Sequence, residues 1–283
     1  MDSRSFLGLR SAGDGRRWSL TVTPELCAGG EFLFGGAGLA AAVAAMEDAT
    51  GRATIWATAQ YLSYARPGWH VDIEVTIAVA GHQMTQSRAI CRVGDREILT
   101  VNAALGHRPF PAAGQFAAMP DVPGPEHCPP RPMRYDPAGT IGALLEQRVV
   151  KYRQLDQLDG VASDGRTLMW MRMPAMIEGV DASTLAVLGD FVPLGVGQAL
   201  GIAGGGNSLD NTLRVVDLVP TEWVLLDIRI DAAARGFGHG SVHMFAQDGT
   251  LLATASQSCI VRFWKDRPVS APTPPGPEGQ GSQ

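Results

Sequence analysis

The feature that most restricts the fold of this chain is an internal repeat. Residues of the first half recur 154 positions later in the second half, in the same order among the expected helices and strands. Five identities share this spacing: Gly35/Gly189, Gly51/Gly205, Thr58/Thr212, Trp69/Trp223 and Thr100/Thr254. Chance does not readily give five matches at one spacing, so we infer a duplication and expect two copies of one folding unit.

Each copy shows the same order of expected elements. An opening strand precedes an apolar helix, which we place at residues 34–47 in the first copy and 185–202 in the second. Both helices are apolar nearly all round, which is typical of full burial. Four segments with strand-like alternation follow each helix. A buried helix needs a sheet to wrap it, and two units can pair their open edges. We therefore predict an α+β fold in which one continuous antiparallel sheet wraps two central helices.

Two segments differ from these copies in composition. Residues 107–137 are rich in proline, which cannot extend a helix or a sheet ladder, so we interpret them as a linker with no ordered contribution to the core. Residues 268–283 have low complexity, which predicts a disordered tail. The expected organisation is an N-terminal unit at 1–106, the linker, a C-terminal unit at 138–267 and the tail.

Composition and charge exclude several classes of protein. The net charge is -5 and no Lys/Arg-rich run occurs, which argues against nucleic acid or an anionic membrane surface as a partner. No segment reaches the roughly 18 consecutive apolar residues of a membrane helix, and the N-terminus lacks a signal-peptide core. We expect a soluble, cytoplasmic protein. The four cysteines are scattered, which favours reduced, buried thiols over a zinc site, and we expect no metal and no other cofactor.

Several motifs can be compared with known families: SLDNTLRVV at 208–216, EW at 222–223, ARGFGHG at 234–240, QDGTLLATASQSCIVR at 247–262, FGG at 34–36 and ARPG at 65–68. Together they resemble those of type II acyl-CoA thioesterases. The resemblance covers most of residues 17–264. It implies the double hot-dog fold and hydrolysis of an acyl-CoA substrate to free acid and coenzyme A, a reaction of lipid metabolism. A homo-oligomer of double hot-dog units is compatible with it.

The resemblance also implies catalytic residues. The family's catalytic Asp falls on Asp210, and its catalytic Gln falls on Gln257. Asn211 stands where the family has a His after the Asp. The family's third polar residue has no clear counterpart, and different gaps place Arg229 or Asp231 there.

The duplication gives an argument that does not depend on the family. The positions equivalent to Asp210 and Gln257 in the first half are Trp56 and Ala103, so only the second half keeps a polar pair. Thioester hydrolysis needs an acceptor for the proton of water and donors for the developing oxyanion. Asp210 and Gln257 have the chemistry to hold that water. We expect one site per chain, with an apolar mirror position.

Backbone donors are expected at the start of the first helix. Gly36 and Ala37 lie there, where N–H groups have no helical partner and carry partial positive charge. We expect these groups to bind the thioester carbonyl, which would build the site across the two halves. Asp190, the equivalent of Gly36, could contact substrate or serve only the structure.

Two rival functions come from other classes. A hot-dog hydratase or dehydratase needs a His paired with an Asp in the pocket, and neither expected helix contains a His. A protein that binds or senses acyl-CoA with little catalysis stays open, because Asn211 and the third polar position depart from the family. The sequence has no GxSxG motif and no Ser-His-Asp order, which argues against an acyl-enzyme formed on serine.

Overall fold

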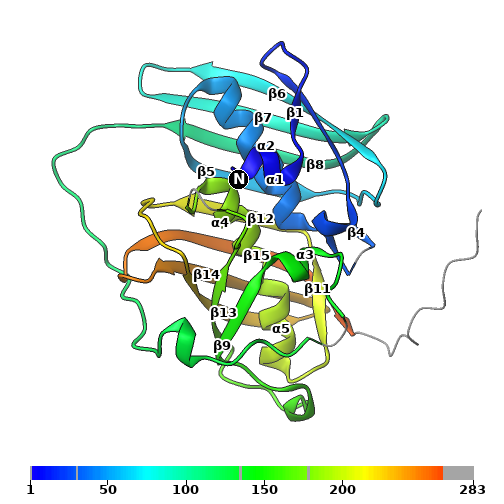
Figure 1. Cartoon of the computed structure of the whole chain (residues 1–283), viewed down its shortest axis with the longest axis vertical. Helices are drawn as coiled ribbons and strands as arrows, with labels where there is room; N and C mark the ends of the chain where they lie inside the picture. Colours follow the sequence, from blue (N-terminus) through cyan, green and yellow to red (C-terminus); the bar gives the residue numbers. More distant parts are fainter. Residues whose placement is uncertain (1, 30, 134–135, 177–178, 264–283) are drawn as a thin grey trace, which may run out of the picture.

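The structure, a computed structural model, describes residues 2–29, 31–133, 136–176 and 179–263. The predicted tail at 268–283 lies outside the described residues. One large antiparallel sheet and a few helices make up the described chain, as the α+β prediction requires (Figure 1). The shorter helices are α1 (Ser3–Leu7) and α3 (Ile141–Leu144), and a separate small sheet pairs β3 (Cys27–Ala28) with β4 (Phe32–Leu33).

The large sheet has the same strand order when it is followed outward from its centre in either direction. In the first half the order is β5 (Thr54–Tyr61), β8 (Arg96–Gly106), β7 (Met84–Val93), β6 (His70–Ala80) and β2 (Arg17–Thr21). In the second half it is β12 (Asp210–Val215), β15 (Leu251–Phe263), β14 (Phe237–Ala246), β13 (Val224–Ala234) and β10 (Arg166–Arg172). The outer edges carry β1 (Arg10–Ser11) and β9 (Glu146–Lys151), and β11 (Gly204–Ser208) also pairs with β15.

The two halves join where β5 pairs with β12. Thr58 lies opposite Thr212, its equivalent in the repeat, and their hydroxyl oxygens are 2.7 Å apart. Two residues away on either side, Asp210 pairs with Gln60 and Arg214 pairs with Trp56. These two pairs are exchanged by the repeat, because Trp56 is the equivalent of Asp210 and Gln60 that of Arg214. The halves therefore meet about an approximate twofold axis through the threonine pair.

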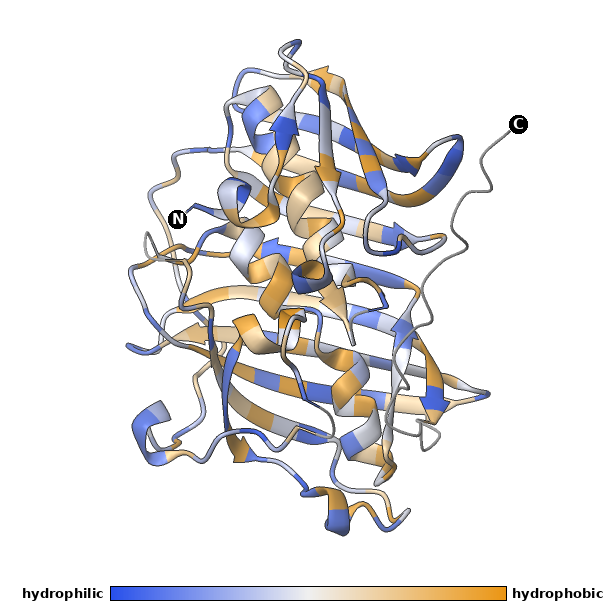
Figure 2. Ribbon diagram, turned by 45° about the vertical axis from the view of Figure 1, so that its right-hand side comes forward, coloured by the Kyte–Doolittle hydropathy of each residue, from blue (hydrophilic) through white to orange (hydrophobic). Residues whose placement is uncertain are grey.

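The central helices fill the concave side of the sheet, where Figure 2 shows their apolar colouring. The first is α2 (Gly35–Thr50), which is buried from Gly36 to Met46 and confirms the expected helix. The second was expected as one helix over 185–202, which is wrong: α4 (Ala182–Leu188) and α5 (Val192–Leu200) are separate. Pro193 lacks an N–H and cannot bond to the carbonyl of Gly189, so the helix breaks between them.

The segment formed by these two helices is apolar on average, although Ser183, Thr184 and Asp190 interrupt it. Ala182–Leu200 has a mean hydropathy of 1.3 and is long enough to cross a membrane. However, 78% of the apolar window is buried inside the protein, which is what the core helix of a sheet-wrapped unit requires.

The proline-rich segment packs onto the protein, so the prediction that it adds nothing to the core is wrong. Trp170 donates its indole N–H to the carbonyl of Pro123 at 2.9 Å. Segment residues Ala117, Met119, Val122 and Cys128 pack on a cluster of Trp170, Trp223, Leu225, Phe245 and Leu251. This cluster lies on the face of the second-half sheet away from α5, since side chains alternate along β13 and Ile228 faces the helix. Apolar residues between the prolines therefore cover one sheet face.

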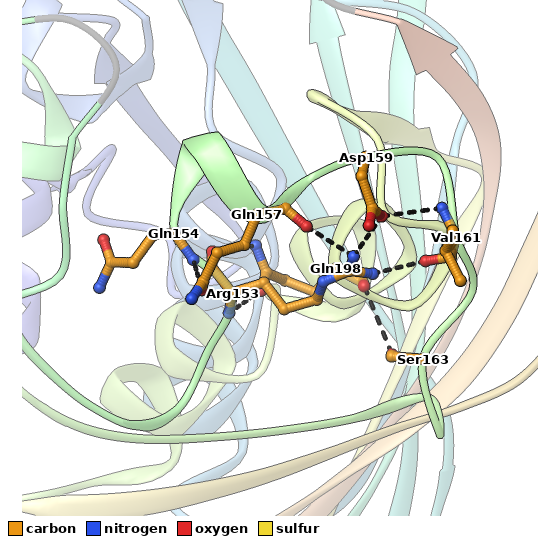
Figure 3. A network of polar contacts seen from close by, with 7 residues as sticks. All are labelled: Arg153, Gln154, Gln157, Asp159, Val161, Ser163 and Gln198. Atoms are coloured by element: carbon orange, nitrogen blue, oxygen red, sulfur yellow. Dashed lines mark hydrogen bonds and ion pairs between the residues drawn. The ribbon is translucent and has the colours of Figure 1, made fainter.

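The connection between β9 and β10 is tied to the end of α5 by a buried glutamine (Figure 3). Gln198 accepts the Arg153 N–H at 2.6 Å and donates its amide to the Arg153 carbonyl at 3.3 Å. The Arg153 guanidinium in turn bonds the Val161 carbonyl and the Asp159 carboxylate, at 2.6 and 2.7 Å. Both amide atoms of Gln198 have partners, so this residue is structural.

Candidate active site

A buried carboxylate links the two halves. Asp190 lies in the break between α4 and α5 and is 5% exposed. Its Oδ2 accepts the Gly36 N–H at 2.6 Å. Gly36 belongs to the first turn of α2, so the carboxylate satisfies an unpaired N–H and lies in the positive field of that helix. Two equivalent positions of the repeat thus meet at the contact between halves.

Two side chains of the second half hold the other oxygen of this carboxylate. Gln257, on β15 and 3% exposed, donates its amide to Asp190 Oδ1, and the Ser208 hydroxyl donates to the same oxygen at 3.2 Å. The side-chain carbonyl oxygen of Gln257 accepts the Val192 N–H at the start of α5, also at 3.2 Å. We call Asp190, Gln257, Ser208 and the Gly36 N–H the Asp190 cluster. Each of its groups is oriented by a partner from a different element.

Burial sets the protonation behaviour of this carboxyl. It raises the pKa of Asp190 to about 6, against the opposing effect of the hydrogen bonds from Gln257, Gly36 and Ser208. A carboxyl with such a pKa is ionised at neutral pH and still basic enough to take a proton from water.

The structure brings some of the predicted site residues together and places others apart. Gln257 and the Gly36 N–H meet at Asp190, and Ala37 follows in the first turn of α2, fully buried. Asp210 lies at the edge of this group: its Oδ1 accepts the Ser258 N–H at 2.7 Å. The Gly36 donor already holds a carboxylate oxygen. The catalytic roles of Asp210 and Gln257 and the carbonyl-binding roles of Gly36 and Ala37 stay predictions.

The two residues proposed for the third polar position lie elsewhere. Arg229 bonds the buried carboxylate of Asp227 at 2.9 Å, which Arg166 also binds, at 2.8 Å. These two guanidinium groups lower the pKa of Asp227 against the effect of its burial. Asp231 is exposed on β13. Neither residue joins the Asp190 cluster.

Two further polar side chains border the cluster. A Cβ atom added to Gly35 would lie 2.7 Å from Asp190 Oδ2 and 3.1 Å from the Tyr61 hydroxyl oxygen, so both oxygens flank this glycine. Burial and the Asp190 charge raise the pKa of Tyr61 well above its usual value. Asn211, on β12, has no exposed surface, and its side chain acts on the Tyr61 hydroxyl as a weak hydrogen-bonding partner, which opposes that shift. Within the described part of the chain, neither side chain makes a hydrogen bond of ordinary geometry.

An apolar pocket begins beside the cluster and runs into the first half. Its cavity volume is about 30 Å³, within about 390 Å³ of space between atoms that is partly open to solvent, and Gly35 and Tyr61 form its end nearest Asp190. Its apolar walls come from α2, the strands beyond it and β4: Leu33, Ala41, Val71, Ile73, Cys91 and Leu99. A chain held there would have its head group at Asp190.

The mirror position carries apolar groups. Ala103, the equivalent of Gln257, is buried, and Trp56, the equivalent of Asp210, is half-buried. Gly189, the equivalent of Gly35, lies against Ala255 and Met244. The polar groups therefore gather on one side of the approximate twofold axis.

Sequence reasoning missed the central role of Asp190, although it had identified this residue as the equivalent of Gly36. Pro193 was the available signal, because a proline at that position predicts a helix break next to Asp190. All four cysteines are buried and unpaired, as expected. No group of three His, Cys, Asp or Glu side chains in the described ranges could hold a metal ion.

Known proteins resemble this chain along most of its length. Residues 125–261 match the acyl-CoA thioesterase C-terminal domain family. The structure of a proposed thioesterase from Novosphingobium aromaticivorans DSM 12444 is 33% identical with a TM-score of 0.78, and the match covers 90% of this chain and 98% of that one. None of the curated proteins matches.

Two more distant structures agree in fold. A hot-dog protein of unknown function from Alicyclobacillus acidocaldarius is 21% identical, with a TM-score of 0.79 over 92% of this chain and 97% of that one. Acyl-CoA thioesterase II TesB2 from Mycobacterium marinum is 18% identical, with a TM-score of 0.71 over 94% and 100%. These likenesses show that the chain has a hot-dog fold.

Proposed function

The chain belongs to the type II acyl-CoA thioesterase family, and we propose that it hydrolyses acyl-CoA to free acid and coenzyme A at the Asp190 cluster. One observation carries this assignment. A buried carboxylate with a pKa of about 6 lies at the end of an apolar pocket, where the two halves meet. Such a carboxylate is suited to activate a water beside a bound acyl group.

The arrangement of the chain that we propose is a tandem pair of hot-dog units, at 1–106 and 138–267. The identical strand order on both sides of the centre supports it. So do two contacts between equivalent positions, Thr58 with Thr212 and Gly36 with Asp190. A fused pair of this kind can keep polar groups in one unit and a pocket in the other, which identical subunits cannot do.

In the proposed reaction, ionised Asp190 accepts a proton from a water as the water oxygen attacks the thioester carbon. A carboxylate has about four acceptor positions, so hydrogen bonds from Gly36, Gln257 and Ser208 leave room for the water. When the tetrahedral intermediate collapses, the C–S electron pair goes to sulfur. The proton on Asp190 passes to the leaving thiolate, which gives free acid and coenzyme A.

The pocket in the first half is the proposed place of the acyl chain. Its walls are apolar, and it ends at Gly35 and Tyr61, beside Asp190. An acyl chain there would put its carbonyl within reach of the carboxylate. The coenzyme A portion would then leave towards solvent.

The test is a panel of acyl-CoA thioesters followed by release of free thiol. We expect turnover by the wild-type protein and a fall in kcat of roughly 1,000-fold in Asp190→Asn, because the amide cannot take the proton. Asp156→Asn, which changes an exposed carboxylate away from the cluster, is the matched control and should keep full activity.

A parallel variant decides which carboxylate is the base. Asp210→Asn should lose less activity than Asp190→Asn, because Asp210 bonds the Ser258 backbone beside Gln257. The reverse order would make Asp210 the base, as the family resemblance implies. Tight acyl-CoA binding without turnover by the wild-type protein would instead assign it a binding or sensing role.

A further inference from the structure

The Asp190 cluster takes up one of the groups that we expected to meet a catalytic requirement. Hydrolysis needs donors for the negative charge that develops on the carbonyl oxygen. The Gly36 N–H, one of the two backbone groups that the sequence suggested for this task, donates to Asp190 Oδ2. Of the two, the Ala37 N–H is left for the thioester carbonyl, and a side-chain donor beside the cluster could face the same oxygen.

Buried polar atoms without a partner are costly, which makes them informative. Gln198 shows the ordinary case: it is 5% exposed, and both amide atoms are bonded to Arg153 (Figure 3). Asn211 has no exposed surface, yet in the described chain neither of its amide atoms makes a hydrogen bond of ordinary geometry. The Tyr61 hydroxyl is in the same situation.

These two side chains come from different halves and meet each other, and Tyr61 also reaches the cluster. Tyr61 ends β5 of the first half, and Asn211 is the second residue of β12, the strand that pairs with β5. The ring of Tyr61 lines the apolar pocket, and its hydroxyl lies against Gly35, where Asp190 Oδ2 is the other neighbour. The hydroxyl thus stands between the proposed acyl position and the proposed base.

We infer that the Tyr61 hydroxyl donates a hydrogen bond to the thioester carbonyl oxygen and to the oxyanion formed from it, and that the neighbouring Asn211 side chain orients this hydroxyl. This inference rests on the proposed function. The raised pKa of Tyr61 keeps the phenol protonated at neutral pH and thus able to donate. Tyr61 keeps its proton throughout the reaction, while Asp190 receives the proton of water and returns it to sulfur.

Removal of the Tyr61 hydroxyl tests its role as a hydrogen-bond donor. Tyr61→Phe keeps the ring in the pocket wall, so kcat should fall roughly 100-fold while KM changes less than about threefold. Tyr152→Phe, which changes a half-buried tyrosine packed against the core of the second half, is the matched control and should keep kcat. Asn211→Leu, of similar volume, should lower kcat about tenfold or more.

The hydrogen bond can also be observed directly. A thioester labelled with carbon-13 at its carbonyl, bound to the slow Asp190→Asn variant, should show a carbonyl stretch shifted to lower frequency than in water. The added Tyr61→Phe change should remove most of that shift.

The outcomes separate this inference from the proposed function. Absence of thioester hydrolysis by the wild-type protein contradicts the proposed function itself. If the wild-type protein turns over and both Tyr61→Phe and Asn211→Leu keep kcat within about threefold, the donor assignment is wrong. An unchanged carbonyl frequency in the double variant overturns it as well, even where one variant folds poorly.

Discussion

The two halves share one strand order but differ in how closely the helix lies on its sheet. In the second half, a Cβ added to Gly195 would lie 2.7 Å from Ile228, and one added to Gly238 would lie 2.6 Å from Val196. The equivalent of Gly195 in the first half is Ala41, which lines the apolar pocket. Glycines thus let α5 close down on its sheet, while α2 leaves space.

The half that has the more closely packed helix also carries more of the polar groups of the site. Asp190, Gln257 and Ser208 form the cluster in the second half, and their first-half equivalents are Gly36, Ala103 and Thr54. The half without the pocket therefore supplies the charged and amide groups, and the half with the pocket supplies space and a helix N-terminus. The comparison shows how a duplicated unit can divide one site between its copies.

Among changes that compare the two halves, replacement of Gln257 should have the largest effect on kcat. Gln257→Leu removes a hydrogen bond to Asp190 and leaves the Val192 N–H without its acceptor, so we expect kcat to fall roughly 100-fold. The equivalent change on the other side, Ala103→Gly, should cost about 1 kcal/mol of stability and keep kcat. Steady-state kinetics and thermal denaturation of both variants check this contrast.

Changes at the equivalent helix positions should act on different properties. Ala41→Leu fills the pocket, so kcat/KM for longer acyl chains should fall about tenfold or more while the shortest substrates are little affected. Gly195→Ala should instead lower stability by about 1–3 kcal/mol, since the methyl group meets Ile228. An identical chain-length profile in both variants would place the acyl chain outside the first half.

The smallest expected effect is a displaced pH profile. The Asp190 carboxyl has a pKa of about 6 and must be ionised to act as the base, so kcat/KM should rise with pH through that value. The Ser208 hydrogen bond lowers this pKa, so Ser208→Ala should move the rising limb above pH 6. The pH dependence of kcat/KM for wild type and variant measures this displacement, and Ser163→Ala, away from the cluster, should leave it unchanged.

The sequence predicted the parts of the structure that depend on periodicity and repetition. Alternating strands and the apolar Phe34–Glu47 segment indicated the sheet and its buried helix, and the asymmetry between Gln257 and Ala103 indicated one polar side. Asp190 was harder to interpret, since a carboxylate inside an expected continuous helix has no evident partner. Its role follows from the break at Pro193 and from the approach of α2, a contact between segments 154 residues apart.

The proline-rich segment shows a second limit of sequence reasoning. Prolines correctly indicated that the segment would form no long helix or strand. They carry no information on whether the residues between them find an apolar surface. Met119 and Val122 pack on Trp170 and Trp223. Which sheet face carries these two tryptophans depends on the register of β10 against β13, which the prolines do not reveal.

The central claim is that the two halves build one site, and its most direct test is a binding stoichiometry. Isothermal titration of the wild-type chain with a non-hydrolysable thioether analogue of acyl-CoA requires no mutation. The account predicts one analogue bound per chain, because only one side of the approximate twofold axis carries the Asp190 cluster. Two equivalent sites per chain would contradict it.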